Sequence, residues 1–154
     1  MTARWPLVAL VALVAIAAAA CGRPPAPEPL DTRHDNCASC RMTVSDRHLA
    51  AQIVASGDEP KFFDDLGCLS QYLATQPIAS DAAVFVADHR TGDWVPAERA
   101  VFSRLTLRST PMASGLVAHE STASRAADAA AAASTIVPAA AVLGKFANRT
   151  EHAL

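Results

Sequence analysis

The spacing of the apolar positions changes along the chain and predicts its elements in order. Residues 49–55 form a short apolar run with β-branched members. A Gly-Asp-Glu-Pro turn separates this run from residues 61–63, which predicts a β-hairpin. Apolar side chains then recur at helical spacing over residues 64–75, where a leading aspartate can cap the helix and Pro77 ends it. The run at 82–87 (AAVFVA) is typical of a buried strand.

The second half of the chain repeats this order. Short strand-like runs occur at residues 94–95, 101–107 and 116–118. Residues 121–133 are rich in alanine, the strongest helix former, and predict a second helix. Residues 136–143 predict a final strand, which Pro138 confines to a sheet edge because proline has no N–H to donate. The two halves together predict an α+β fold of two packed β-β-α-β units.

The N-terminal apolar run has the layout of a secretory signal peptide. Arg4 supplies a positive start, and the run at residues 7–20 is shorter than the roughly 20 apolar residues that cross a bilayer as a helix. The run ends in alanines directly before Cys21, an arrangement similar to the lipobox of bacterial lipoproteins, with alanine at position 18 where leucine is usual. We therefore expect residues 1–20 to be removed and Cys21 to carry the lipid.

The segment after Cys21 predicts a tether over residues 21–35, because four prolines between positions 23 and 29 favour an extended polyproline II conformation. Such a segment can hold a domain away from a membrane surface. We expect a compact domain over residues 36–144 and a C-terminal tail, 145–154, that shows no interpretable pattern. This organisation predicts a protein that is lipid-anchored on the periplasmic side of a bacterial membrane.

Charge and cysteine content narrow the function classes. Removal of residues 1–20 leaves 12 basic and 15 acidic side chains, a formal charge of −3, with no basic run. Nucleic acid is not an expected partner, because phosphates require clustered lysine and arginine. Lipidation of Cys21 leaves Cys37, Cys40 and Cys68, an odd number in an exported protein, so at least one thiol has no disulfide partner.

The spacing Cys37-x-x-Cys40 is compatible with several chemistries. Covalent haem attachment requires a histidine directly after the second cysteine, where this chain has Arg41. A structural zinc site needs a second pair of Cys or His ligands, and Cys68 has no such neighbour. A thioredoxin-type pair normally precedes a long helix, whereas a strand is predicted here. Although this setting argues against it, a thiol–disulfide oxidoreductase that uses the Cys37–Cys40 pair remains the alternative function.

The spacing Cys40-x-Met42 offers a different chemistry. On an extended segment, a thiolate and a thioether two residues apart project to the same side. Both are soft sulfur donors, which select a soft ion such as Cu(I). Met112 lies in a loop between Pro111 and Gly115 and is expected to be partly exposed. Packing as a flexible apolar side chain is the alternative role for each methionine.

His48 and Cys37 are weaker candidate ligands. His48 shares a face with Met42 only if the strand between them is continuous. Cys68 is expected to pack as a small buried thiol. A disulfide between Cys68 and Cys37 is the alternative, and it would leave Cys40 as the free thiol.

Several motifs, taken in order, resemble the NosL family. They are the lipoprotein cysteine, Cys-x-Met followed by Val-Ser-Asp, A-A-Q-I-V, F-F-D-D-x-G-C-L, and T-P-M-x-S-G-L-V-A. The resemblance covers about residues 37–133 and implies a fold of two β-β-α-β units. It also implies a non-enzymatic lipoprotein that binds Cu(I) and delivers it for assembly of nitrous oxide reductase. The partners so implied are that enzyme and its ABC-type maturation complex.

The ligands that the resemblance implies are Cys40, Met42 and Met112. This chain departs from the family pattern at three positions. Arg41 is charged where small or uncharged residues are common, Ala113 replaces a glycine, and His119 stands where an aromatic residue is expected.

Overall fold

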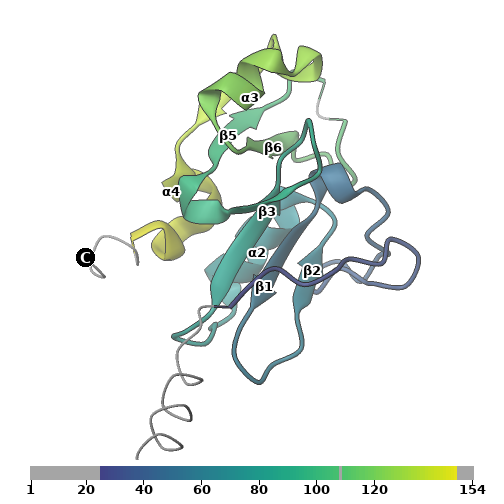
Figure 1. The fold of residues 1–154 in the computed structure, drawn as a ribbon, viewed down its shortest axis with the longest axis vertical. Helices are drawn as coiled ribbons and strands as arrows, with labels where there is room; N and C mark the ends of the chain where they lie inside the picture. Colours follow the sequence, from purple (N-terminus) through teal and green to yellow (C-terminus); the bar gives the residue numbers. More distant parts are fainter. Residues whose placement is uncertain (1–24, 108, 149–154) are drawn as a thin grey trace, which may run out of the picture.

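The computed structural model describes residues 25–107 and 109–148, so the predicted signal peptide and Cys21 lie outside the described residues. Two antiparallel sheets form the described part, with helices beside each sheet (Figure 1). None of the helices in these ranges is long and apolar enough to cross a membrane.

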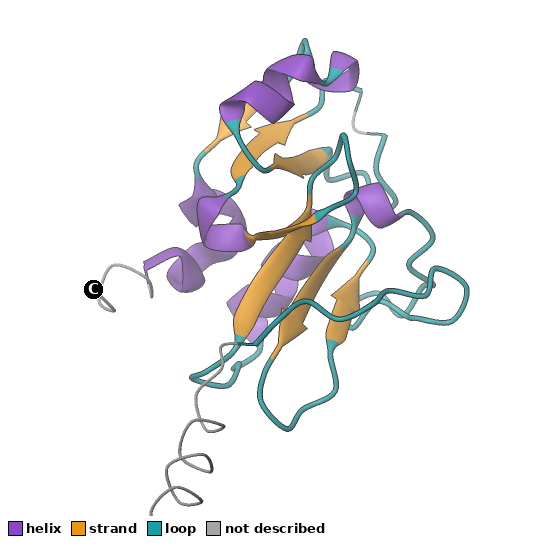
Figure 2. Ribbon diagram, in the orientation of Figure 1, coloured by secondary structure: helices purple, strands orange, loops and turns teal. Residues whose placement is uncertain are grey.

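The first sheet has the strand order β2-β1-β3-β4. Its elements are β1 (Ala51–Val54), β2 (Lys61–Phe63), α2 (Leu66–Thr75), β3 (Ala83–Ala87) and β4 (Trp94–Pro96). All four residues of β1 are buried. The helix α2 lies behind this sheet, and the N-terminal segment crosses its other face (Figure 2).

That N-terminal segment belongs to the predicted tether, yet it contacts the sheet. The backbone N–H of Glu28 donates to Oε1 of Gln52 over 2.8 Å, and Nε2 of Gln52 donates to the carbonyl of Glu28 over 3.1 Å. Leu30 packs against the core. The amide of Gln52, which is fully buried in β1, is therefore satisfied by the segment that precedes the domain.

The second sheet repeats the arrangement of the first three strands. Its elements are β5 (Val101–Arg104), β6 (Leu116–His119), α3 (Thr122–Ala127) and β7 (Thr135–Val137), with strand order β6-β5-β7. The orders β2-β1-β3 and β6-β5-β7 are equivalent, which confirms the predicted α+β fold with two β-β-α-β units. The predicted strand at 94–95 belongs to the first sheet, because β4 pairs with β3.

The chain after residue 137 departs from the prediction of a strand over 136–143. The strand β7 ends at Val137, and Ala139–Leu143 form the helix α4, which packs against α2. Pro138 precedes the first turn with φ of −59°, a conformation suited to a helix start, and alanines follow it. The 3₁₀ turn Gly144–Asn148 comes next, and Phe146 is buried in the core, so the predicted tail begins inside the fold.

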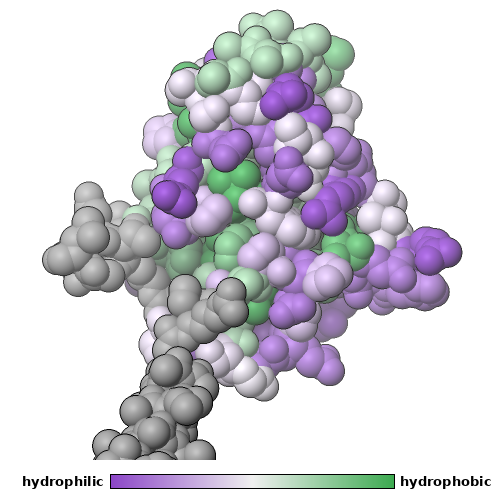
Figure 3. Space-filling view, viewed as in Figure 1, coloured by the Kyte–Doolittle hydropathy of each residue, from purple (hydrophilic) through white to green (hydrophobic). Residues whose placement is uncertain are grey.

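The predicted helix over 121–133 is interrupted. It forms α3 and a separate 3₁₀ turn, Ala129–Ala131, with Asp128 between them in an extended conformation. The side chain of Asp128 caps the 3₁₀ turn and also contacts two histidines, and these tertiary contacts outweigh the helix propensity of the alanines. Small apolar side chains gather on the surface at this alanine-rich end (Figure 3).

The two units are joined where the turn after β3 meets β6. Asp88 forms a parallel bridge with Ala118, and the N–H of His89 donates to the carbonyl of Ala118 over 2.8 Å. The carboxylate of Asp88 also accepts from Ser124 in α3 and from the backbone of Glu120. These bonds fix the second unit on the first.

We expect Leu143→Ala to lower the free energy of unfolding by about 2–5 kcal/mol, because the side chain is fully buried and its loss leaves a cavity. Ile136→Ala is the matched control: Ile136 is 58% exposed and should lose less than about 1 kcal/mol. Urea unfolding curves measure both. Equal losses would contradict the helical packing of α4 and favour the strand over 136–143.

Candidate metal centre

The segment from Cys37 to Met42 folds into a closed loop beside β2. The N–H of Cys37 donates to the carbonyl of Met42 over 2.8 Å, and the N–H of Arg41 donates to the carbonyl of Cys37 over 3.0 Å. The N–H of Ala38 donates to the carbonyl of Phe62, which holds the loop against the edge of the first sheet. The position of both cysteines is therefore set by the sheet.

Three thiols and one carboxylate converge beneath this loop. The sulfur atoms of Cys37, Cys40 and Cys68 and a carboxylate oxygen of Asp64 all lie within 4.8 Å of one another. Cys37, Cys68 and Asp64 are buried, whereas Cys40 is partly exposed. The cluster therefore has a closed inner side and one thiol at its outer side. Cys37, Cys40 and Cys68 are all free thiols, so the structure does not contain the Cys37–Cys68 disulfide that the sequence analysis gave as an alternative.

Asp64 and Cys68 enter this cluster because of the start of α2. Asp64 follows β2 directly and precedes the N-cap Asp65, and Cys68 lies in the first turn of the helix, so the turn from β2 into α2 brings these two side chains together. The thiol of Cys40 donates to both carboxylate oxygens of Asp64, over 3.4 and 3.5 Å. The spacing of Asp64 and Cys68 can be read from the sequence, but the position of the Cys37–Met42 loop against them cannot.

Burial controls the protonation of the thiols. Burial raises the pKa of Cys40 above its usual value, although an N–H from Met42 opposes the rise, and the neighbouring Cys37 and Asp64 add to it. Burial also raises the pKa of Cys68, with further contributions from Cys37 and Asp64. Both thiols therefore hold their protons at neutral pH, and a metal ion that binds them must displace those protons.

The loop that carries Met112 is attached to the start of α2. Asp65, the N-cap of α2, accepts from the hydroxyl of Thr110 over 2.6 Å and from the N–H of Met112 over 3.0 Å. Burial opposes ionisation of Asp65, but hydrogen bonds from Ser114, Thr110 and the backbone hold its pKa below the usual value. The backbone of Met112 is thus fixed beside the residue that follows Asp64.

Gly67 allows this close approach. A Cβ at position 67 would lie 2.8 Å from the Cβ of Ser114, so a larger residue would push the Met112 loop away from the helix. The Met112 side chain itself is 47% exposed, as expected from the sequence. Ala113 adopts a left-handed backbone with φ of 55°, which accounts for the glycine expected at this position.

Met42 lies on the exposed side of the cysteine loop, with 52% of its surface accessible. The segment from Cys40 to Met42 is not extended, because Arg41 has a left-handed φ of 69°. The geometric basis of the Cys40-x-Met42 prediction was therefore wrong. The backbone N–H of Met42 nevertheless acts on Cys40, because it lowers the thiol pKa that burial raises.

His48 is not part of the thiol cluster. It lies in the 3₁₀ turn Arg47–Leu49, and its Nδ1 is 3.0 Å from the carbonyl oxygen of His89 in the turn after β3. The structure therefore groups Cys37 and Cys40 with Asp64 and Cys68, and leaves His48 near the junction of the two units.

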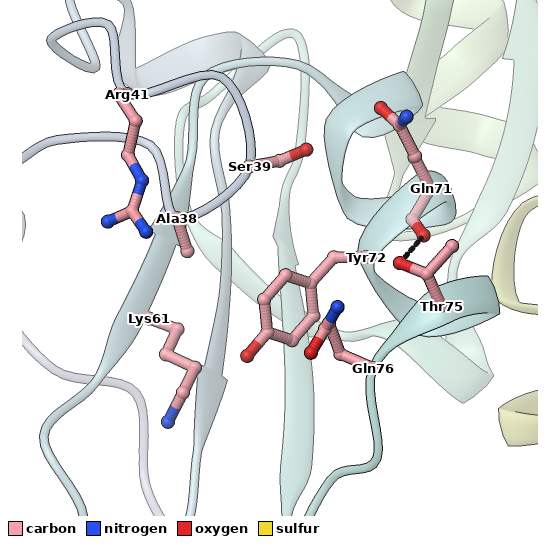
Figure 4. A pocket seen from close by; sticks show the side chains of 8 residues that line it. All are labelled: Ala38, Ser39, Arg41, Lys61, Gln71, Tyr72, Thr75 and Gln76. Atoms are coloured by element: carbon pink, nitrogen blue, oxygen red, sulfur yellow. Dashed lines mark hydrogen bonds between the residues drawn. The ribbon is translucent and has the colours of Figure 1, made fainter.

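A polar cleft of about 530 Å³ opens beside the cysteine loop. Its lining residues are Ala38, Ser39, Arg41, Lys61, Gln71, Tyr72, Thr75 and Gln76 (Figure 4). Figure 4 shows Arg41 and Lys61 on the side of the cleft opposite Gln71 and Thr75. None of the described sulfur atoms lines this cleft, so it is separate from the thiol cluster.

These features define a class: a two-unit α+β protein whose sulfur-rich cluster fits a metal site. A protein-family model named NosL matches residues 30–144, most of the chain, and the chain belongs to that family. No curated protein and no solved structure matches it. Membership of the family, together with the thiol cluster, supports a copper-binding protein.

The raised pKa of Cys40 makes a prediction for the metal-free protein. At pH 8 a smaller fraction of Cys40 is thiolate than in free cysteine, so its alkylation by iodoacetamide should be slower, and the rate should still rise above pH 9. Mass spectrometry of the Cys40 peptide against glutathione as a reference measures this. A rate that reaches its plateau below pH 8 would indicate an activated thiolate and would favour the oxidoreductase.

Proposed function

We propose that this protein is a periplasm-facing lipoprotein metallochaperone that binds Cu(I) and delivers it for assembly of the copper centre of nitrous oxide reductase. The observation that carries the proposal is the asymmetry of the cluster. One thiol of the buried cluster, Cys40, is partly exposed, and the half-exposed Met42 follows it by two residues. The loop of the half-exposed Met112 is hydrogen-bonded to Asp65, the neighbour of Asp64 in the cluster. Family membership supports copper as the metal.

In this proposal Cys40 supplies the anionic sulfur, and the thioethers of Met42 and Met112 complete a soft, low-coordinate site. The carboxylate of Asp64 accepts a hydrogen bond from the thiol of Cys40. Asp64 is therefore positioned to receive the thiol proton when Cys40 binds the ion as a thiolate. Both methionine side chains are about half exposed, so a ligand from a partner protein can approach the ion and take it by exchange. Partners of this kind are nitrous oxide reductase and its ABC-type maturation complex.

The alternative function, a thiol–disulfide oxidoreductase acting through Cys37 and Cys40, has less support. Such enzymes lower the pKa of the attacking thiol, commonly at the N-terminus of a helix. Here burial raises the pKa of Cys40, which lies in a loop rather than at a helix start, and Cys37 is fully buried.

Cu(I) affinity should depend on the proposed ligands in a set order. We expect Cys40→Ala to weaken binding by about 100-fold or more, which corresponds to roughly 2.7 kcal/mol, because it removes the only charged ligand. Met42→Leu and Met112→Leu should each weaken it by about tenfold, since a thioether is a neutral and weaker donor. Competition against a coloured Cu(I) chelator under reducing conditions measures all three.

Cys37→Ala is the matched control for Cys40→Ala and should change the affinity least. Leucine preserves the volume and apolarity of methionine, so both leucine variants should fold. If Cys37→Ala and Cys40→Ala lost affinity equally while both leucine variants matched the wild type, the site would be a two-cysteine loop. The methionines would then have no ligand role.

The lipid anchor is tested separately. We expect Cys21→Ser to abolish acylation, because a serine offers no thiol for the thioether-linked lipid, and the precursor should remain unprocessed. Mass spectrometry of the N-terminal peptide from the membrane fraction measures this. Acyl mass on the Cys21→Ser protein would contradict the lipobox prediction.

A further inference from the structure

The internal repeat gives His119 an equivalent in the first unit. Asp65 caps α2 and Ser121 caps α3, and these helices hold the same place in the two β-β-α-β units. Phe63 and His119 each lie two residues before their cap and end the equivalent strands β2 and β6. The first unit thus has a core phenyl ring where the second has a fully buried imidazole.

Two further side chains meet His119 at this position. Its Nε2 lies 2.9 Å from Oδ2 of Asp128, and Nδ1 of His89 lies 2.6 Å from the same oxygen. The two imidazole rings pack edge to face with centroids 5.9 Å apart. These three ligand atoms all lie within 4.8 Å of one another.

The three residues come from three separate segments. His89 lies in the turn after β3, His119 ends β6, and Asp128 lies between α3 and the 3₁₀ turn that follows it. The cluster therefore crosses the junction of the two units. It is also separate from the thiol cluster, with which it shares no residue.

The local structure orients the carboxylate of Asp128. Its Oδ1 accepts from the N–H of Ala130 over 2.9 Å, so Oδ2 is the oxygen presented to both imidazoles. Burial opposes its ionisation, but hydrogen bonds from His89 and His119 lower the pKa of Asp128 to about 2. The cluster therefore places one anionic oxygen between two imidazole rings.

We propose that His89, His119 and Asp128 form a second metal site, which takes a divalent cation of borderline softness such as Zn²⁺. Imidazole and carboxylate ligands suit such ions, whereas Cu(I) prefers sulfur. A single anionic ligand with two neutral imidazoles is also a donor set found in zinc sites with one open position. His89 and Asp128 keep 17% and 10% of their side chains exposed, which leaves that position reachable from solvent.

Ion binding requires a small rearrangement. Ligand atoms around a tetrahedral zinc with bonds of about 2.0–2.1 Å lie about 3.3 Å apart. The nitrogens of His89 and His119, now 2.6 and 2.9 Å from Oδ2 of Asp128, must therefore move away from it by about 0.7 and 0.4 Å. The ion would replace the two N–H···O bonds. With Nε2 of His119 donating to Asp128, Nδ1 is the unprotonated ring nitrogen and is buried without a hydrogen-bond partner. An ion on Nε2 would require the ring proton to move to Nδ1, so ion binding must offset the cost of one buried N–H that has no acceptor.

The test uses the mature chain under reducing conditions, with Co²⁺ as a spectroscopic probe and Zn²⁺ as its competitor. We expect one Co²⁺ per chain to bind at this site, with ligand-field absorption that carries no thiolate charge-transfer band and that Cys40→Ser retains, because the site contains no sulfur. His119→Phe, which restores the aromatic residue of the other unit, should weaken this binding at least tenfold. Asp128→Asn preserves the shape of the carboxylate and should weaken it similarly. His34→Gln, at an exposed histidine paired with Asp31, is the matched control and should bind as the wild type does.

Two-dimensional NMR of the imidazole resonances gives a second readout on the wild-type chain, independent of any variant's folding. Added Zn²⁺ should shift the ring resonances of His89 and His119 and leave those of His34 unchanged. Unshifted resonances of His89 and His119, or undiminished Co²⁺ binding by His119→Phe, would overturn the proposal. The three residues would then serve only as a hydrogen-bonded contact between the two units. Loss of the Co²⁺ spectrum in Cys40→Ser would assign the ion to the thiols instead. Because no Cu(I) is used, these outcomes are independent of the proposed chaperone function.

Discussion

The buried carboxylate of Asp65 is the contact on which the candidate copper site depends. It caps the helix α2, and the same group accepts from Thr110 and from the backbone of Met112 in the other β-β-α-β unit. One charge thereby fixes the start of a helix in one half and a loop in the other. Since Asp64 precedes it and Cys68 follows it by three residues, the cap also sets the position of two members of the thiol cluster.

This arrangement explains how the site can be both stable and accessible. The buried side, formed by Cys37, Cys68 and Asp64, is part of the hydrophobic core and the base of the cysteine loop. The outer side consists of side chains on two tight loops with left-handed residues, Arg41 and Ala113. Such conformations cost of order 1 kcal/mol or more for residues other than glycine, and the surrounding hydrogen bonds must maintain them. The proposed carrier function benefits from this division, because the proposed ligands are held in place while the bound ion would remain open to exchange.

The two units share a topology but use it differently. In the first, the strand end before the helix carries Phe63, which packs on Tyr72 with ring centroids 5.3 Å apart. In the second, the equivalent position carries His119, and the helix that follows is cut short where Asp128 turns toward it. A polar group at a core position requires a buried partner, and Asp128 meets this requirement at the expense of continuing α3 through the alanines that follow it.

The sequence by itself determined the fold class, the order of most elements, the cap and end of α2, and the family. Each of these depends on spacing, turn residues and propensity along a local stretch of chain. The prediction of a strand over 136–143 followed its β-branched residues, Ile136, Val137 and Val142, although the alanines between them favour a helix. The tertiary structure forms the helix and buries Leu143 in the core. The sequence also singled out Cys37 and Cys40, but the turn at Arg41 and the convergence of Asp64 and Cys68 with them came only from the tertiary structure. The same holds for His89, His119 and Asp128, because strand register and the packing of one unit on the other bring together residues that no local pattern relates.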